Sequence, residues 1–305
     1  MTAKSEDVWQ EASEQLISAR DVIRFGATQM AQSDIYFGHG TDNAWDEAIF
    51  LLLEVLQLPW SLLDSIIDAR LTQSERDQVL NLYLRRIHER KPAPYLVGRA
   101  WFAELPFLVN EHVLVPRSPF AELIEKQFSP WLTKNPERIL DLCTGSGCIG
   151  IATALAFPES TVDLSDISAH AVDTAWQNID YHQVDDRVRA VESDLFSALD
   201  DQRYDLIITN PPYVDKEDLD SMPKEYHHEP EIALASGEDG LDFTRRLLTE
   251  AKKHLTEDGL LFCEVGNSWW ALDEAFPDLN LTWIEFENGG HGVFVIDAKT
   301  LAQHF

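Results

Sequence analysis

This chain of 305 residues has few cysteines and no long apolar run, and both scarcities exclude classes of protein. Its three cysteines, Cys143, Cys148 and Cys263, form no Cys-x-x-Cys pair, which argues against a disulfide framework and against a zinc site. No apolar stretch approaches the roughly 18 residues of a membrane span. The N-terminus shows no basic-then-apolar secretory pattern. We therefore expect a cytoplasmic protein without membrane association.

Basic residues are also scarce: 24 Lys and Arg stand against 53 Asp and Glu, a formal net charge of −29. A protein that grips a phosphate backbone needs a basic stripe to displace counterions. The main basic cluster lies on a predicted helix in the first third of the chain and comprises Arg85, Arg86, Arg90 and Lys91. The charge favours a basic protein partner over nucleic acid. The charge does not exclude nucleic acid as a partner, because an acidic surface can also serve solubility alone.

The length favours two domains, at about 150 residues each. Residues 1–92 are predicted to be a helical domain, with an apolar face over 45–56 and a capping-box pattern at Thr72 and Glu75 ahead of another amphipathic segment. Residues 93–115 are predicted to be a linker with a β-hairpin over 95–102 and 105–109. Residues 116–305 are predicted to form an α/β domain. Its last strands, over 281–286 and 293–296, read as a terminal antiparallel hairpin.

A glycine-rich turn follows the first predicted strand of the α/β domain. Residues 138–143 read as a buried strand, residues 144–147 as a Thr-Gly-Ser-Gly turn, and residues 148–157 as an apolar helix. Glycines here let the backbone approach a ligand closely. The residues Gly145, Gly147 and Gly150 also satisfy G-x-G-x-x-G, a pattern that leaves a nicotinamide cofactor open.

Acidic side chains follow at the ends of the next two predicted strands. Asp166 lies about 20 residues beyond the glycines, where an acid can bind ribose hydroxyls. Asp194 ends a third strand and could reach an adenine amino group. Because ligands collect at the carboxyl ends of parallel strands, we expect Asp141 and the glycines to lie at the same edge. The alternative for Asp166 and Asp194 is a helix cap or a solvated loop.

The fourth predicted strand, residues 205–209, ends in Asn210, Pro211, Pro212 and Tyr213, here called the Asn-Pro-Pro-Tyr segment. Proline has no N–H and fixes φ, so neighbouring carbonyls are not all consumed by backbone pairing. Asn210 Oδ1 and the Pro211 carbonyl are therefore candidate acceptors for the two hydrogens of a planar –NH2 group, with the Tyr213 ring against its face. The alternative is a turn that only closes the strand.

Two other groups of residues are interpreted structurally. His39 and the run His227, His228 and Glu229 lack the spaced ligand set of a metal site, so we predict none. Trp176 and the pair Trp269 and Trp270 are interpreted as core or surface packing residues rather than a base-stacking platform.

Together these motifs resemble the class I S-adenosylmethionine-dependent methyltransferases, and more narrowly the HemK-type protein glutamine methyltransferases. The resemblance includes V-L-V-P-R at 113–117 and the E-P…A-L…G…D-G-L pattern over 229–241. Where release-factor enzymes carry R-P-[ED]-T, this chain has Arg117, Ser118 and Pro119, and Cys143 replaces a common glycine. These departures, with F-G-H-G-T at 37–41, resemble the branch that acts on large-subunit ribosomal protein L-three.

The resemblance implies a seven-stranded, Rossmann-like sheet with an antiparallel last strand, residues 116–305 as the catalytic domain, and residues 1–92 as the part that recognises the substrate. For the N-terminal domain, a cap that only stabilises the protein is the alternative. The implied cofactor is S-adenosyl-L-methionine, bound by Asp141, Cys143, Thr144, Gly145, Ser146, Gly147, Asp166, Asp194, Leu195 and Asn210. The implied catalytic residues are Asn210, Pro211, Pro212 and Tyr213.

The implied partner is a basic ribosomal protein of the large subunit, met before assembly, without stable binding of nucleic acid. Three alternatives stay open: a methyltransferase of exocyclic amino groups in nucleic acid, a release-factor glutamine methyltransferase, and a nicotinamide-dependent oxidoreductase.

Overall fold

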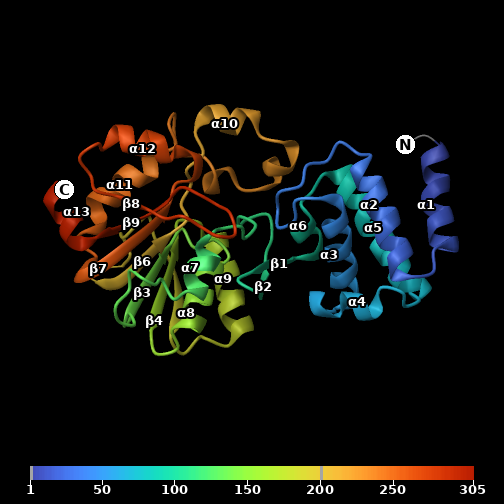
Figure 1. Cartoon of the computed structure of the whole chain (residues 1–305), viewed down its shortest axis with the longest axis horizontal. Helices are drawn as coiled ribbons and strands as arrows, with labels where there is room; N and C mark the ends of the chain where they lie inside the picture. Colours follow the sequence, from blue (N-terminus) through green and yellow to red (C-terminus); the bar gives the residue numbers. More distant parts are fainter. Residues whose placement is uncertain (1–2, 200–201) are drawn as a thin grey trace. The chain divides into compact units, whose positions relative to one another are not determined.

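A computed structural model describes residues 3–199 and 202–305, which divide into two compact units (Figure 1). The smaller unit comprises the chain up to Gly98 together with Pro223–His228. The larger unit comprises Arg99–Met222 and Glu229–Phe305. The chain thus leaves the larger unit for six residues shortly after the Asn-Pro-Pro-Tyr segment and then returns to it.

The larger unit is built on a seven-stranded sheet of order β5-β4-β3-β6-β7-β9-β8. The strands are β3 (Arg138–Leu142), β4 (Thr161–Asp166), β5 (Val188–Glu192), β6 (Tyr204–Thr209), β7 (Leu255–Glu264), β8 (Thr282–Trp283) and β9 (Val293–Asp297). The first five in space pair in parallel, and β9 runs antiparallel to both β7 and β8. The seven-stranded sheet with its terminal antiparallel hairpin is therefore confirmed.

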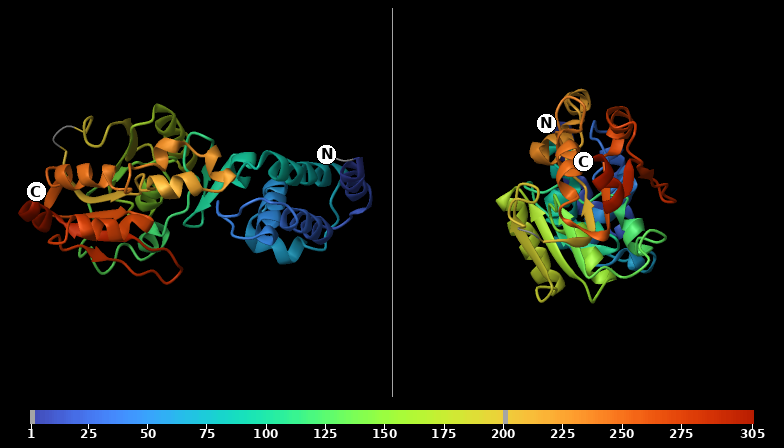
Figure 2. Two further views of the ribbon diagram at one scale, coloured as in Figure 1. Left: turned by 90° about the horizontal axis from the view of Figure 1, so that it is seen from above. Right: turned by 90° about the vertical axis from the view of Figure 1, so that its left-hand side faces the viewer.

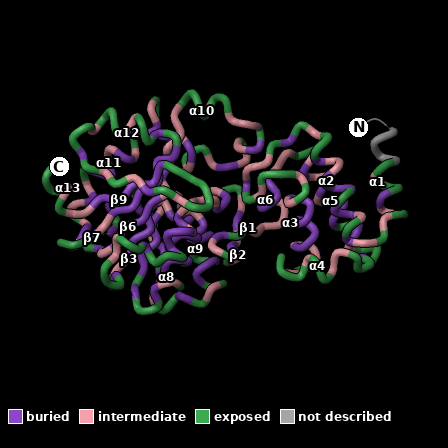
Figure 3. Tube along the Cα trace, viewed as in Figure 1, coloured by how far each residue is buried: buried purple, intermediate pink, exposed green. Residues whose placement is uncertain are grey.

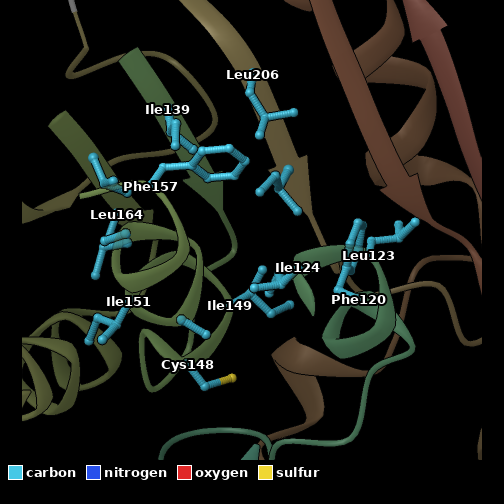
Figure 4. Packing of buried hydrophobic residues seen from close by; sticks show 14 of the residues in the cluster. Phe120, Leu123, Ile124, Ile139, Cys148, Ile149, Ile151, Phe157, Leu164 and Leu206 are labelled. Atoms are coloured by element: carbon cyan, nitrogen blue, oxygen red, sulfur yellow. The ribbon is translucent and has the colours of Figure 1, made fainter. Parts of the chain in front are cut away.

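Helices cover both faces of this sheet (Figures 1 and 2). On one face, a buried apolar cluster is shared by the strands and three helices, α7 (Phe120–Glu125), α8 (Cys148–Ala156) and α9 (Ala169–His182). Figure 4 shows Phe120, Ile149 and Phe157 among the residues of this cluster. On the other face, α11 (Asp242–Ala251), α12 (Trp269–Ala275) and α13 (Ala298–His304) contribute to a second cluster. Strands β3 and β6 are almost wholly buried (Figure 3), which explains their nearly continuous apolar sequence.

A hairpin of β1 (Arg99–Phe102) and β2 (Leu105–Leu108) begins the larger unit. Asn178 of α9 holds it, since its side chain accepts from the Leu108 N–H at 2.7 Å and donates to the Leu108 carbonyl at 2.9 Å. The prediction of a strand from residue 95 is wrong, because residues Ala93–Val97 form the short helix α6. Prolines suit the first turn of a helix, and Gly98 in the left-handed region ends it.

The smaller unit is helical, with α1 (Ala3–Gln15), α2 (Ala19–Ala31), α3 (Ala44–Leu56), a 3-10 turn (Trp60–Leu62), α4 (Leu63–Ile66), α5 (Gln73–Glu89) and α6. Thr72 and Glu75 form the expected capping box at the start of α5. No single helix in the described part of the chain is long and apolar enough to cross a membrane; only α3 with Trp60–Ile66, bent by 97°, passes that test as a pair.

Hydrogen bonds and ion pairs of Glu225 hold the segment Pro223–His228 in the smaller unit. Glu225 is buried and accepts from the Tyr36 N–H at 3.0 Å and from Arg90 at 3.1 Å. Arg86, also buried, lies 2.7 Å from Glu47 and 3.6 Å from Glu225. The basic cluster of the sequence is thus largely engaged by carboxylates of the same unit.

Two further basic residues of the smaller unit are also engaged there. Arg85 pairs with Glu89 at 2.8 Å, and His228 Nε2 lies 3.1 Å from the Glu89 carbonyl.

Within residues 3–199 and 202–305, no group of three or more His, Cys, Asp or Glu side chains is arranged to hold a metal ion.

Candidate active site

A cavity of about 320 Å³ lies in the larger unit, lined by the carboxyl ends of β3, β4, β5 and β6 and the loops that follow them. Its lining includes the predicted residues Cys143, Thr144, Gly145, Ser146, Asp166, Asp194, Leu195, Asn210 and Pro212. Four other predicted residues, Asp141, Gly147, Pro211 and Tyr213, are not among the residues that line it. Most of the predicted site is therefore brought together in one place.

The glycine loop, residues 143–147, bends sharply at this edge. Cys143, Gly145 and Gly147 all have positive φ, of 56°, 54° and 82°. A Cβ on Gly145 would meet nothing within 4 Å, so its backbone faces open space. A Cβ on Gly150 would lie 2.1 Å from Leu164 Cδ2, so this glycine allows α8 to pack closely on β4.

Asp141 lies behind this loop, fully buried at the end of β3. Its Oδ2 accepts from Thr144 Oγ1 at 2.6 Å and from the Gly150 N–H at 2.8 Å. Its Oδ1 is buried and has no hydrogen-bond partner among the residues that the structure describes. Burial, opposed by these hydrogen bonds, raises the pKa of Asp141 to about 7. Asp141 thus ties the loop to the helix that follows it.

Two acids of the strand ends line the cavity. Asp166 accepts from the Gly145 N–H and from the Ser168 N–H, each at 2.9 Å, and desolvation raises its pKa. Asp194 pairs with Arg246 of α11 at 3.0 Å, and both side chains remain about half exposed. Arg246 was not predicted, because nothing in its local sequence separates it from a surface arginine.

The Asn-Pro-Pro-Tyr segment follows β6, whose Thr209 is paired in register with Cys263 of β7. Asn210 lines the cavity, and its side chain makes no hydrogen bond within the described residues. Tyr213 donates its hydroxyl to Glu264 Oε1 at 3.0 Å, and its carbonyl accepts from Ser268 Oγ at 2.8 Å. Asn210 therefore offers an unused amide at the cavity, while Tyr213 is tied to β7 and the residues after it.

The Tyr213 ring also packs on the backbone, because a Cβ on Gly266 would come within 2.5 Å of it. Pro211 is buried. The direct substrate contacts expected of Pro211 and Tyr213 stay predictions.

Another wall of the cavity comes from the loop 113–118. Arg117 forms a two-pronged ion pair with Glu229, with both N–O distances 2.6 Å, and Glu229 Oε1 also accepts from the Val115 N–H at 3.0 Å. Two motifs that are more than 100 residues apart in the sequence are thereby joined.

The cavity suits a nucleoside. Acidic oxygens of Asp166 and Asp194 are acceptors for hydroxyl and amino groups, and Ile167, Leu195 and Phe243 supply apolar surface for a flat base. The open space at Gly145 allows close approach to the backbone. The residues present therefore fit a nucleoside cofactor.

Comparison with known proteins identifies the family. Residues 125–226 match the model of the methyltransferase small domain. The chain is 45% identical over 302 residues to the ribosomal protein uL3 glutamine methyltransferase of Francisella tularensis, covering 98% of this chain and 96% of that protein. It is 46% identical over 294 residues to the protein of the same name from Xanthomonas campestris, covering 96% and 95%.

Among solved structures, the chain is similar to a methyltransferase from Pyrococcus furiosus, with 18% identity, a TM-score of 0.46 and coverage of 63% of this chain and 88% of that one. The methyl donor is S-adenosyl-L-methionine, as expected from the resemblance. The chain belongs to the family of ribosomal protein uL3 glutamine methyltransferases.

Proposed function

We propose that this enzyme transfers a methyl group from S-adenosyl-L-methionine to the side-chain amide nitrogen of a glutamine in ribosomal protein uL3. The observation that carries the proposal is the unused Asn210 side chain, which lines the same cavity as the glycine loop and Asp166. A planar amide can exchange hydrogen bonds with another planar amide, whereas a hydroxyl or thiol substrate would need a base to activate it.

The cofactor is held by the glycine loop and the two strand-end acids. Asp166 would accept from the ribose hydroxyls, Asp194 and the segment at Leu195 would bind the adenine, and the loop 143–147 would hold the rest of the cofactor. Asp141 does not line the cavity, but its hydrogen bonds from Thr144 and the Gly150 N–H fix the glycine loop and the start of α8.

The protein residues then orient the glutamine. When bound, S-adenosyl-L-methionine supplies an electrophilic methyl group. Asn210 Oδ1 and the Pro211 carbonyl accept the two N–H groups of the substrate amide, which raises electron density on its nitrogen and fixes its direction of approach. Pro212 lines the cavity beside them, and Tyr213 holds the segment in place. Correct orientation alone is worth about 7–11 kcal/mol in favourable reactions.

The substrate protein is proposed to be met free of the ribosome, in the cytoplasm. The charge of −29 attracts a basic protein and repels nucleic acid. The engagement of Arg85, Arg86 and Arg90 by carboxylates supports the absence of stable nucleic-acid binding. We further propose that the helical domain, predicted as residues 1–92, selects the substrate; exchanging it for that of a release-factor enzyme tests this.

Labelled S-adenosyl-L-methionine tests the function directly. The enzyme is incubated separately with unmethylated uL3, a peptide-chain release factor and ribosomal RNA. Label on a uL3 glutamine, located by mass spectrometry, supports the proposal. Label only in the release factor or only in RNA would replace it with one of the two alternatives. Binding of NAD(H) without binding of S-adenosylhomocysteine would favour an oxidoreductase.

A further inference from the structure

Glu264 is a buried carboxyl beside the proposed active site that the mechanism above does not use. It is the last residue of β7, directly after Cys263, which pairs in register with Thr209. It is 4% exposed. Its two oxygens accept two hydroxyl groups: Oε1 from Tyr213 at 3.0 Å and Oε2 from Ser118 at 2.6 Å.

The two hydroxyl donors belong to different parts of the site. Tyr213 ends the Asn-Pro-Pro-Tyr segment, three residues after Asn210. Ser118 lines the cavity and its Oγ also accepts from the Phe120 N–H at 3.2 Å, at the start of α7. Glu264 therefore joins the Asn-Pro-Pro-Tyr segment to the loop 113–118 by a hydrogen bond to each.

A buried carboxyl is an unfavourable choice for stability alone, because an apolar side chain of similar volume avoids the desolvation cost. A carboxylate can, however, accept from two hydroxyls at once in fixed directions. We propose that Glu264 is a positioning residue of the methyl transfer, holding Tyr213 and Ser118 so that Asn210 and the facing loop keep the spacing that the glutamine amide requires. This inference rests on the proposed function.

The ionisation of Glu264 supplies a specific readout. Burial raises its pKa to about 7, although the hydrogen bonds from Ser118 and Tyr213 and the charge of Arg117 act to lower it. Of the groups that face it, Arg117 is held by Glu229, and Tyr213 and Ser118 donate their hydroxyls to it. Below about pH 7 Glu264 is mostly protonated, and the oxygen that carries the proton is a weaker acceptor, so the hydrogen bond from one of the two hydroxyls is weakened.

The test compares Glu264→Gln and Glu264→Ala with Glu257→Gln, an exposed glutamate near the other end of the same strand. Glutamine can still accept from Tyr213 and donate to Ser118 Oγ, because the serine hydroxyl rotates. We expect kcat to fall about 10-fold in Glu264→Gln and about 100-fold or more in Glu264→Ala, with the dissociation constant of S-adenosyl-L-methionine changed less than about 3-fold. Glu257→Gln should change neither quantity.

Two further readouts separate positioning from stability. The ratio of wild-type kcat to that of Glu264→Gln should rise between about pH 6 and pH 8, because only the wild type has an acceptor that protonation weakens. Adding Tyr213→Phe to Glu264→Ala should cost less than the product of the two single losses, since both substitutions remove the hydrogen bond between Tyr213 and Glu264. A pH-independent ratio together with independent losses would overturn the inference.

Hydrogen exchange provides an outcome that needs no substrate. In Glu264→Ala, peptides covering residues 205–216 and 112–122 should both exchange faster than in Glu257→Gln. Unchanged exchange in both peptides would overturn the inference even if wild-type enzyme proved inactive on uL3. Inactivity of the wild type on every substrate, with faster exchange in both peptides, would instead count against the proposed function alone.

Discussion

Replacing Asp141 by asparagine should remove a pH dependence from the stability of the larger unit. Asp141 is fully buried, and burial raises its pKa to about 7 in the folded protein. In the unfolded chain the carboxyl titrates near its ordinary value of about 3.9. Between these two values the folded protein holds a proton that the unfolded chain has released, so the free energy of unfolding must fall as the pH rises.

The size of the effect follows from the difference between the two pKa values. Three units correspond to roughly 4 kcal/mol, at about 1.4 kcal/mol for each unit. Because the unfolded carboxyl is already ionised at about pH 5, roughly 2–3 kcal/mol of this loss falls between pH 5 and pH 8. Asparagine keeps the acceptor for Thr144 and Gly150 and cannot ionise, so Asp141→Asn should lack this component.

The measurement is urea unfolding of both proteins at about pH 5 and pH 8, followed by hydrogen exchange in peptides of β3 and α8 so that the larger unit is observed alone. Glu257→Gln serves as the matched control, since that glutamate is exposed. The difference in unfolding free energy between wild type and Asp141→Asn should change by about 2–3 kcal/mol over this range. Parallel pH curves for the two proteins would refute the reasoning about the buried carboxyl.

Three other predictions concern single side chains of the site. Asn210→Ala should lower kcat by about 10²–10³-fold with little change in cofactor affinity measured by calorimetry, because it removes an oriented acceptor; near-normal turnover would exclude the orienting role. Asp166→Ala should weaken S-adenosyl-L-methionine binding by about 10–150-fold, with Asp166→Asn intermediate, and an unchanged dissociation constant would contradict the ribose assignment. Gly150→Ala should lower the free energy of unfolding by about 1–3 kcal/mol, because the added Cβ would lie 2.1 Å from Leu164 and 2.9 Å from Asp141. Helix propensity alone predicts the opposite, a more stable variant. That result would show that Leu164 moves aside.

The features that could be predicted from the sequence are those whose cause is local. The apolar strands, the glycine loop and the proline-bounded end of β6 each carry their signal within a few residues, and the parallel order of the sheet then places Asp166, Asp194 and Asn210 at one edge. The capping box of α5 was found for the same reason.

The features that were missed depend on partners distant in the chain. Glu264 accepts a hydrogen bond from Ser118, 146 residues away, and Arg246 pairs with Asp194, 52 residues away. The return of Pro223–His228 to the smaller unit rests on Glu225, whose partners Arg86 and Arg90 precede it by more than 130 residues. A single sequence contains no signal for such pairs. The helix at Ala93–Val97 was predicted as a linker and the start of a strand, although Pro92 and Pro94 stand where prolines are tolerated, at the beginning of a helix.

The central claim is that Asn210 holds the substrate amide beside the methyl donor. The most direct test is a crystal structure of the enzyme with S-adenosylhomocysteine and a uL3 peptide that contains the target glutamine. We predict that Asn210 Oδ1 lies within about 2.7–3.2 Å of the glutamine Nε2, and that this nitrogen faces the cofactor sulfur. A glutamine bound elsewhere, or an Asn210 side chain directed away from it, would contradict the claim.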